Sequence, residues 1–184
     1  MSAGEVRYPL GTALVVATNL LHLLEPACER IEVAGSVRRK KPDVGDVELL
    51  CIPKATENLF YPDALDERIR GLIGNGILGY RLNRNGSQQY GPLNKLLVHL
   101  GSGIPVDIFS TEAKYWGMAM TMRTGPAEFN IRMMSRFRGL GMRGHAYAGI
   151  SSMTNHDIEC PDEATVFRHL GWPYLEPEER NKRP

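Results

Sequence analysis

Two carboxylates, Asp46 and Glu48, are separated by one residue in the otherwise apolar segment DVELLCIP, residues 46–53. The composition of this segment predicts a β-strand, in which alternate side chains point to the same face. Two carboxylates on one face of a buried strand repel each other unless a cation lies between them. Carboxylate oxygens favour Mg²⁺ or Mn²⁺ over zinc, whereas a solvated strand face is the common alternative explanation for such a pair.

A third carboxylate, Asp107, is a lone charge in the apolar segment IPVDIFS, residues 104–110. This segment and LLVHL, residues 96–100, flank a short glycine-containing loop and predict a β-hairpin. If the hairpin packs beside the first two predicted strands, at residues 30–35 and 46–53, Asp107 can join Asp46 and Glu48 to hold two metal ions. In-line phosphoryl or nucleotidyl transfer requires this arrangement, in which one ion activates a hydroxyl and the other stabilises the leaving pyrophosphate.

A glycine–serine turn precedes the carboxylates. A predicted strand at residues 30–35 ends at Gly35, and the backbone N–H groups and hydroxyl of the Gly35–Ser36 turn can bind phosphate oxygens. Arg39 adds a fork-shaped cation that suits a triphosphate, although the dipeptide alone is a weak signal and a plain basic turn is the alternative. Because Ser36 lies ten residues before Asp46, the combination is a strong signal for a nucleotide phosphate site.

The elements that must position these side chains indicate an α+β protein. Residues 10–24 are apolar and predict a largely buried helix, and residues 62–73 predict an amphipathic helix on the surface of a sheet. From about residue 116 the pattern changes to two helices separated by Arg-Thr-Gly-Pro. We therefore predict a first domain at residues 1–115, with a mixed sheet and helices, and a small, mostly helical domain at residues 116–184.

The overall composition limits the classes of protein. The chain has 184 residues, 42% of them hydrophobic, and 22 Lys+Arg against 21 Asp+Glu, which is typical of a soluble globular protein. We expect a cytoplasmic protein without a secretory signal, a membrane association or a disulfide framework. With a net charge of +1, nucleic-acid binding must come from local patches. The best patch has four arginines, which are Arg132, Arg136, Arg138 and Arg143.

Four segments carry a resemblance to a known family. GSVRR at residues 35–39, followed by GDVE at residues 45–48, resembles the signature of the polymerase beta nucleotidyltransferase superfamily. WGMAMTMRTGPAEFNIRMM at residues 116–134 and FRHLGWPYLEPEERN at residues 167–181 resemble segments of the X family of DNA polymerases. The motifs occur in family order over most of the chain, so we identify a resemblance to the beta- and lambda-like members of that family.

The resemblance implies a nucleotidyltransferase palm followed by a thumb-like subdomain that binds the nascent base pair. It assigns the two metal ions, Mg²⁺ or Mn²⁺, to Asp46, Glu48 and Asp107, with Asp107 as the expected base for the primer 3′ hydroxyl. The implied triphosphate contacts are Gly35, Ser36, Arg39 and Gly45. The positions implied to line the sugar and base of the nucleotide are Thr124, Gly125 and Asn130.

The resemblance predicts a template-directed DNA polymerase that adds dNTPs to a primer 3′ end, in a primer–template or in gapped DNA during repair. One alternative is a template-independent nucleotidyltransferase that tails a DNA or RNA 3′ end or modifies another acceptor. A second alternative is a DNA-binding protein with a decayed site. The C-terminal segments favour the first function, because minimal transferases commonly lack them. We expect a monomer, in the cytoplasm, the nucleoid or a virus-infected compartment.

Several positions depart from the family pattern. Glu48 replaces a usual second aspartate, Met122 and Arg123 replace a Tyr-Phe pair that helps to exclude ribonucleotides, and Pro105 replaces an arginine near the third aspartate. The resemblance begins at the palm, so we expect no lyase activity and a minimal form of the polymerase.

Overall fold

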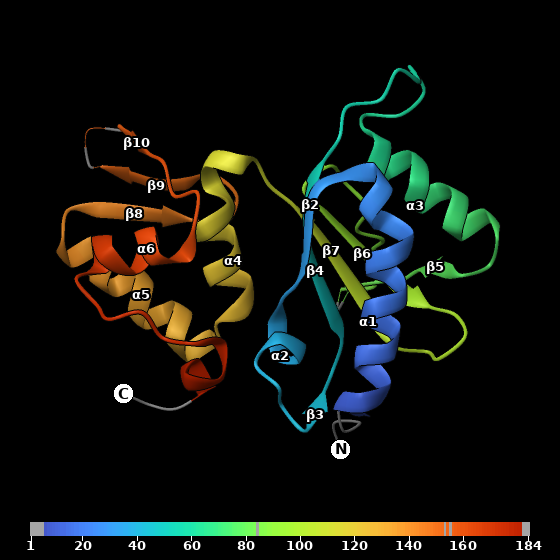
Figure 1. The fold of residues 1–184 in the computed structure, drawn as a ribbon, viewed down its shortest axis with the longest axis horizontal. Helices are drawn as coiled ribbons and strands as arrows, with labels where there is room; N and C mark the ends of the chain where they lie inside the picture. The colour runs from blue at the N-terminus through green and yellow to red at the C-terminus, as the bar shows by residue number, and fades with distance from the viewer. Residues whose placement is uncertain (1–5, 84, 153, 155, 182–184) are drawn as a thin grey trace. The chain divides into compact units, whose positions relative to one another are not determined.

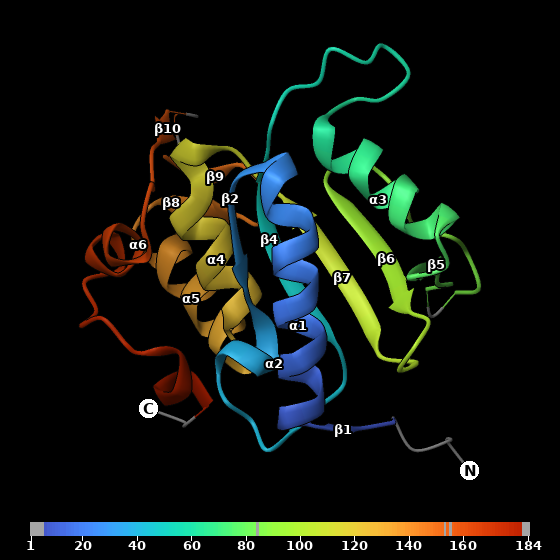
Figure 2. The same ribbon diagram turned by 45° about the vertical axis from the view of Figure 1, so that its right-hand side comes forward.

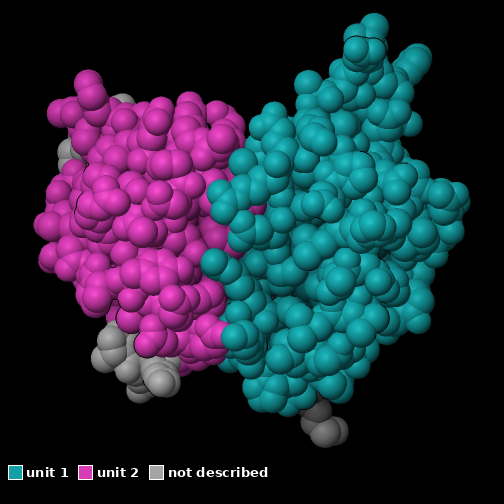
Figure 3. Space-filling model, viewed as in Figure 1, with its two compact units in different colours: residues 1–110 teal, residues 111–184 magenta. Residues whose placement is uncertain are grey.

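The computed structural model describes residues 6–83, 85–152, 154 and 156–181. The chain divides into two compact units, residues 1–110 and residues 111–184 (Figure 3). The boundary predicted near residue 115 falls at the end of a 3₁₀ turn in the second unit, η2 (Ala113–Tyr115).

The N-terminal unit is built on a five-stranded mixed sheet with the order β2-β4-β7-β6-β5. Strand β4 pairs in parallel with β7, and the other neighbouring strands pair antiparallel. The parallel pair requires a crossover connection, which contains a helix and the strands β5 and β6. The strands are β2 (Cys28–Val33), β4 (Val47–Pro53), β5 (Leu78–Tyr80), β6 (Asn94–His99) and β7 (Pro105–Ser110).

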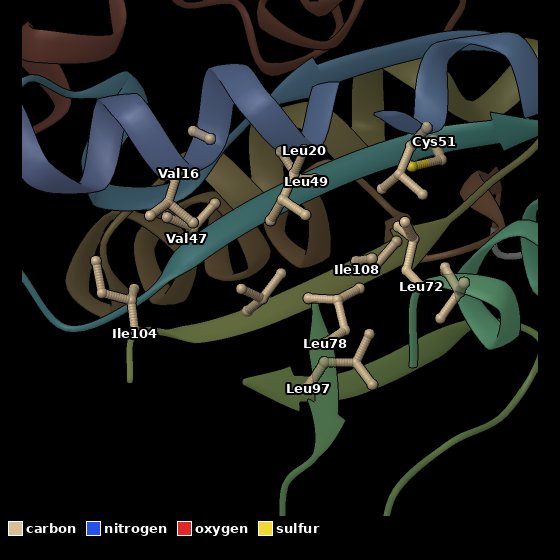
Figure 4. Packing of buried hydrophobic residues seen from close by; sticks show 14 of the residues in the cluster. Val16, Leu20, Val47, Leu49, Cys51, Leu72, Leu78, Leu97, Ile104 and Ile108 are labelled. Atoms are coloured by element: carbon tan, nitrogen blue, oxygen red, sulfur yellow. The ribbon is translucent and has the colours of Figure 1, made fainter. Parts of the chain in front are cut away.

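Two helices, α1 (Leu10–Leu24) and α3 (Ala64–Gly74), cover one face of this sheet (Figures 1 and 2). Alternate residues of β4, such as Val47 and Leu49, are fully buried against them, and Figure 4 shows how these side chains pack. The period of two in β4 therefore commits one face of the strand to the hydrophobic core. Glu48, between Val47 and Leu49, points to the opposite face of the sheet.

The first helix is unusually apolar. Together with the 3₁₀ turn η1 (Glu25–Ala27) it forms an 18-residue segment that is long and apolar enough to cross a membrane. Its buried positions nevertheless recur at helical spacing and join the core of the N-terminal unit. Those positions are Ala13, Val16, Ala17, Leu20 and Leu24. We therefore interpret α1 as the core helix of this unit.

Three short elements complete the N-terminal unit. A two-stranded sheet joins β1 (Tyr8–Pro9) to β3 (Asp43–Val44), and the four-residue helix α2 (Gly35–Arg38) follows β2. The predicted strand at residues 30–35 thus ends earlier than expected, because Gly35 already begins α2. The chain needs this early turn to reverse direction before β4.

The C-terminal unit is mostly helical. Together with the mixed sheet of the N-terminal unit, it confirms the predicted α+β class with a helical second part. Its main helices are α4 (Trp116–Thr124), α5 (Ala127–Gly139) and α6 (Glu163–Leu170), with a final 3₁₀ helix η3 (Pro177–Asn181). A three-stranded antiparallel sheet accompanies them, with β8 (Met142–His145), β9 (Gly149–Ser152) and β10 (Asp157–Ile158). Turn residues 146–148 separate β8 from β9, and these two strands form an antiparallel hairpin.

A buried arginine, Arg180, holds the end of the C-terminal unit against α6. Its side chain is completely buried, and its Nη1 donates to Glu163 Oε1 at 2.7 Å. Two further nitrogens of the guanidinium donate to the carbonyl oxygen of Leu175 at 3.0 and 2.9 Å. Because its buried charge is paired and hydrogen-bonded, Arg180 is well placed to stabilise this unit.

Candidate active site

The structure places Glu48 and Asp107 side by side on the sheet. They are register partners on the parallel strands β4 and β7, so both side chains lie on the same face. The sequence neighbours of Glu48, which are Val47 and Leu49, are buried on the helix-covered face, whereas Glu48 is only partly buried. Asp46 lies immediately before β4, and the alternation of burial from Asp46 to Leu49 continues the strand pattern. The hairpin strand that carries Asp107 therefore packs beside the strand that carries Glu48, as the sequence predicted.

Gly35 provides a close approach between the glycine–serine turn and Glu48. Its φ angle is +63°, a conformation that glycine adopts at little cost. A Cβ atom at this position would lie only 1.8 Å from Oε2 of Glu48. Backbone conformation and space therefore both require glycine, and the Glu48 carboxylate packs directly over the turn.

The predicted phosphate-binding turn is a single helical turn. The N–H groups of Arg38 and Arg39 donate to the carbonyl oxygens of Ala34 and Gly35, each at 3.2 Å. Earlier N–H groups in a helix have no intrahelical acceptor, so the first residues of α2, Gly35 and Ser36, present donors of the kind that bind phosphate.

The other two predicted triphosphate contacts flank this turn and the carboxylates. Arg39 is 8% exposed and directly follows α2. Gly45 forms the bend between β3 and β4, just before Asp46. Gly45 adjoins the start of β4 and Gly35 approaches Glu48, whereas the contact of all four residues with a nucleotide stays a prediction.

One residue at this site was missed in the sequence. Arg81, directly after β5, forms an ion pair between its Nη2 and Oδ1 of Asp107. Its backbone N–H donates to Leu96 O at 3.2 Å, and its Nε donates to Leu97 O at 3.2 Å. Leu96 is the register partner of Asp107, so Arg81 reaches across β6 to the carboxylate. No local motif marks this arginine, which only the strand pairing brings to the site.

The connection that follows Arg81 is fixed by packing. The Tyr90 ring meets the Tyr80 ring edge to face at a centroid separation of 5.3 Å, and burial raises the pKa of the Tyr90 hydroxyl. On β6, Lys95 is 1% exposed, and its Nζ donates to Gly91 O at 3.1 Å. Burial lowers the pKa of Lys95. These contacts hold the segment between β5 and β6 against the sheet.

The oxygen donors of the predicted metal ligands match a hard divalent cation in chemistry. In the part of the chain that the structure describes, no group of three His, Cys, Asp or Glu side chains is arranged to hold a metal ion. Glu48 packs on Gly35, and Asp107 pairs with Arg81. The donors therefore share one face without converging on a point, and metal binding by Asp46, Glu48 and Asp107 stays a prediction.

The three predicted nucleotide contacts of the C-terminal unit lie at the junction of α4 and α5. Thr124 is fully buried, and its hydroxyl contacts Sδ of Met120 at 3.4 Å. Asn130 Nδ2 donates to Met122 O at 2.8 Å and to Gly125 O at 3.3 Å. The Asn130 side chain therefore ties the start of α5 to the end of α4. Contact of these residues with sugar or base stays a prediction.

The structure separates the four predicted DNA-binding arginines into different environments. Arg138 and Arg143 are exposed and line one cavity of about 550 Å³ beside His145. Arg136 Nε instead donates to Leu170 O at 2.9 Å, which connects α5 to the end of α6. Arg132 is partly buried. Arg138 and Arg143 are consequently the best placed of the four for a phosphate backbone.

Comparison with known proteins agrees with the predicted resemblance. Residues 119–181 match the family model of the DNA polymerase beta thumb. Over 161 residues the chain is 27% identical to DNA polymerase lambda of Rattus norvegicus. The match covers 80% of this chain and 28% of the relative. The chain thus spans little more than a quarter of that relative's length.

These two matches confirm that the chain is related to the X family of DNA polymerases. The thumb match lies within the C-terminal unit, and the match to the lambda enzyme is long enough to include part of the N-terminal unit as well.

Proposed function

We propose that this chain is a template-directed DNA polymerase that adds dNTPs to a primer 3′ end, in a primer–template or in gapped DNA. The observation that carries the proposal is the position of Glu48 and Asp107 as register partners on neighbouring strands, with Glu48 against the Gly35 turn. Residues 119–181 of the same chain match the polymerase beta thumb. The proposed protein acts as a monomer.

In the proposed reaction the primer 3′ oxygen attacks the α-phosphorus of the dNTP. A bond forms between these atoms, the bond from the α-phosphorus to the bridging oxygen breaks, and pyrophosphate leaves with that electron pair. Asp107 accepts the proton of the 3′ hydroxyl at a carboxylate oxygen. Gly35, Ser36 and Arg39 bind the triphosphate and orient its α-phosphate for in-line attack.

Asp46, Glu48 and Asp107 are the residues that would hold divalent cations. Bound there, Mg²⁺ or Mn²⁺ supplies charge stabilisation for the attacking and leaving oxygens. The Asp-to-Glu difference at position 48 adds one methylene to the family pattern, and the longer carboxylate packs closely on Gly35.

Primer extension with each single dNTP, on templates that differ only in the opposing base, tests the proposal. We expect addition of the complementary nucleotide alone, and loss of addition in Asp107→Asn. Asp43→Asn is a matched control, because Asp43 is an exposed acid on β3 of the same unit. Addition that ignores the template would favour a tailing transferase, and absence of addition with either Mg²⁺ or Mn²⁺ would exclude both activities.

Glu48 offers a sharper test of the ligand assignment. Glu48→Asp keeps a carboxylate and should retain activity, whereas Glu48→Gln keeps the shape and should abolish it, because the amide is a neutral, weaker ligand. Single-nucleotide addition with Mg²⁺ and with Mn²⁺ measures both. An active Gln variant would remove Glu48 from the proposed metal site.

The proposed DNA contact of Arg138 and Arg143 is tested by salt dependence. If both neutralise phosphates, replacing both by alanine lowers the slope of log affinity against log salt by about two. Fluorescence anisotropy with a primer–template measures this slope. Arg30→Ala is a control on an exposed arginine of the N-terminal unit. An unchanged slope in the double variant would exclude these two contacts.

A further inference from the structure

Arg81 is a cation within the row of residues that carries the proposed catalytic carboxylates. Across the sheet this row runs from Arg81 through Leu96 on β6 to Asp107 on β7 and then to Glu48 on β4. The Arg81 side chain is 29% exposed and that of Asp107 is 15% exposed. The pair is therefore shielded from bulk water but not closed to a ligand that approaches this face.

The anchoring of Arg81 fixes where its charge lies. Its backbone N–H and its Nε donate to consecutive carbonyl oxygens of β6, Leu96 and Leu97. These two hydrogen bonds leave Nη2 to contact the carboxylate of Asp107. A guanidinium held at the backbone in this way restricts the rotamers of its carboxylate partner, because the ion pair is strongest in one geometry.

The same guanidinium opposes a divalent cation. Two positive charges that share one carboxylate repel each other, and at a partly shielded site this repulsion exceeds its value in water. Arg81 therefore has two opposite effects at Asp107: it orients the carboxylate, and it weakens the binding of a second cation there.

We propose that Arg81 is a positioning residue that restricts the orientation of the Asp107 carboxylate and sets the divalent-cation affinity of the site. The proposal rests on the proposed function, since it assumes that Asp107 is a cation ligand. Arg81 acts through Asp107 and does not contact the reacting atoms.

Mn²⁺ binding to the full chain, without DNA or nucleotide, tests the proposal independently of activity. Electron paramagnetic resonance of free Mn²⁺ gives the Kd for the wild-type protein, Arg81→Met, Arg81→Lys and Asp107→Asn. Because Arg81→Met removes the competing charge, the Kd of this variant for Mn²⁺ should be about three- to tenfold lower than that of the wild type. Arg81→Lys keeps the charge and should bind Mn²⁺ as the wild type does.

Steady-state nucleotide addition provides the second measurement. Loss of orientation should lower the kcat of Arg81→Met by about tenfold with little change in KM for the dNTP, and Arg81→Lys should recover part of the kcat. Arg30→Met is the matched control, because Arg30 pairs with Glu32 on β2, where both side chains are well exposed. Thermal unfolding of each variant verifies that the protein remains folded.

The outcomes separate this inference from the proposed function. If Asp107→Asn weakens Mn²⁺ binding but folded Arg81→Met leaves the Kd unchanged, the role of Arg81 is excluded and the metal site stands. If Asp107→Asn does not affect Mn²⁺ binding, the metal site and the role of Arg81 are both excluded. A tighter Kd and a lower kcat in Arg81→Met, with wild-type values in Arg30→Met, would support the proposal.

Discussion

Two arginine–carboxylate pairs, one chosen from each unit, differ in their surroundings. Arg180 and Glu163 in the C-terminal unit are 0% and 8% exposed, whereas Arg81 and Asp107 in the N-terminal unit are 29% and 15% exposed. The Arg180 guanidinium also lies over three aromatic rings, those of Phe129, Phe167 and Tyr174.

We expect this difference to separate an ion pair that stabilises the fold from one that acts at the proposed site. A fully enclosed pair cannot exchange partners without leaving a buried charge unpaired, so removal of one partner acts on stability. A pair at an accessible sheet face gains little stability and can share its carboxylate with a ligand. Arg180→Met and Arg81→Met test this distinction directly, and Gly35→Ala and Asp162→Ala should give effects of intermediate size.

The largest expected effect is on the buried pair. Arg180→Met leaves the Glu163 carboxylate buried without its cation and should lower the free energy of unfolding of the C-terminal unit by about 3–5 kcal/mol. Urea unfolding followed by circular dichroism measures the change. The double variant Arg180→Met/Glu163→Gln should recover part of it, because no unpaired charge remains. A loss below about 1 kcal/mol would contradict a stabilising role for the pair.

Gly35→Ala should disturb both stability and activity. The positive φ angle costs the alanine variant about 1–3 kcal/mol of unfolding free energy, and its Cβ must displace the Glu48 carboxylate. Gly76→Ala is a matched control, since Gly76 has a φ of +71° and no atom lies within 4 Å of a Cβ there. Urea unfolding and nucleotide addition should show similar strain in both variants and slow addition only in Gly35→Ala. Equal addition rates would contradict the close approach of Gly35 to Glu48.

Asp162 at the start of α6 should give a smaller, pH-dependent effect. Its side chain accepts a hydrogen bond from Thr165 N at 2.7 Å, which lowers the pKa of the carboxyl below its ordinary 3.8. This stabilisation is present above the pKa of the unfolded chain and is lost as the pH falls through the lower pKa of the folded state. Asp162→Ala should cost about 1 kcal/mol at pH 7.

Urea unfolding from pH 7 to pH 3 measures this dependence. The difference in unfolding free energy between wild type and Asp162→Ala should shrink toward the acid end. Asp162→Asn, an equally good cap without charge, should show no such trend in this range. A constant difference for the alanine variant would contradict the hydrogen bond to a charged carboxylate.

The smallest stability effect is expected at the accessible pair. Arg81→Met should change the free energy of unfolding by less than about 1 kcal/mol, because partly exposed ion pairs stabilise proteins weakly. Urea unfolding in the presence of EDTA measures this without a bound cation. A loss as large as that of Arg180→Met would remove the distinction between the two pairs.

The sequence predicted most of the N-terminal unit because its long elements have strong periodic patterns. The helix expected at residues 10–24 has those same bounds in the structure, and alternation in β4 and β7 placed Glu48 and Asp107 in strands. Short elements were harder to predict. Strand β5 has only three residues, and α2 has four, so neither spans enough residues to show a period.

The candidate site was predictable where its residues form a local motif. The glycine–serine turn and the acidic pair are close in sequence, and Asp107 is the only charge in its strand. Arg81 could not be found in this way, because its contact with Asp107 depends on the register of β5, β6 and β7. Similarly, a sequence pattern could not separate Arg136, which bonds to Leu170, from Arg138 and Arg143.

The parallel pairing of β4 with β7 has a consequence for the order of folding. The turn at Gly35 and strand β4 can form from neighbouring residues, but Glu48 meets Asp107 only after α3, β5 and β6 have closed the crossover between them. Such long-range closure is slow compared with local structure formation. During synthesis, the face that carries the carboxylates therefore remains incomplete until the last strand of the sheet has left the ribosome.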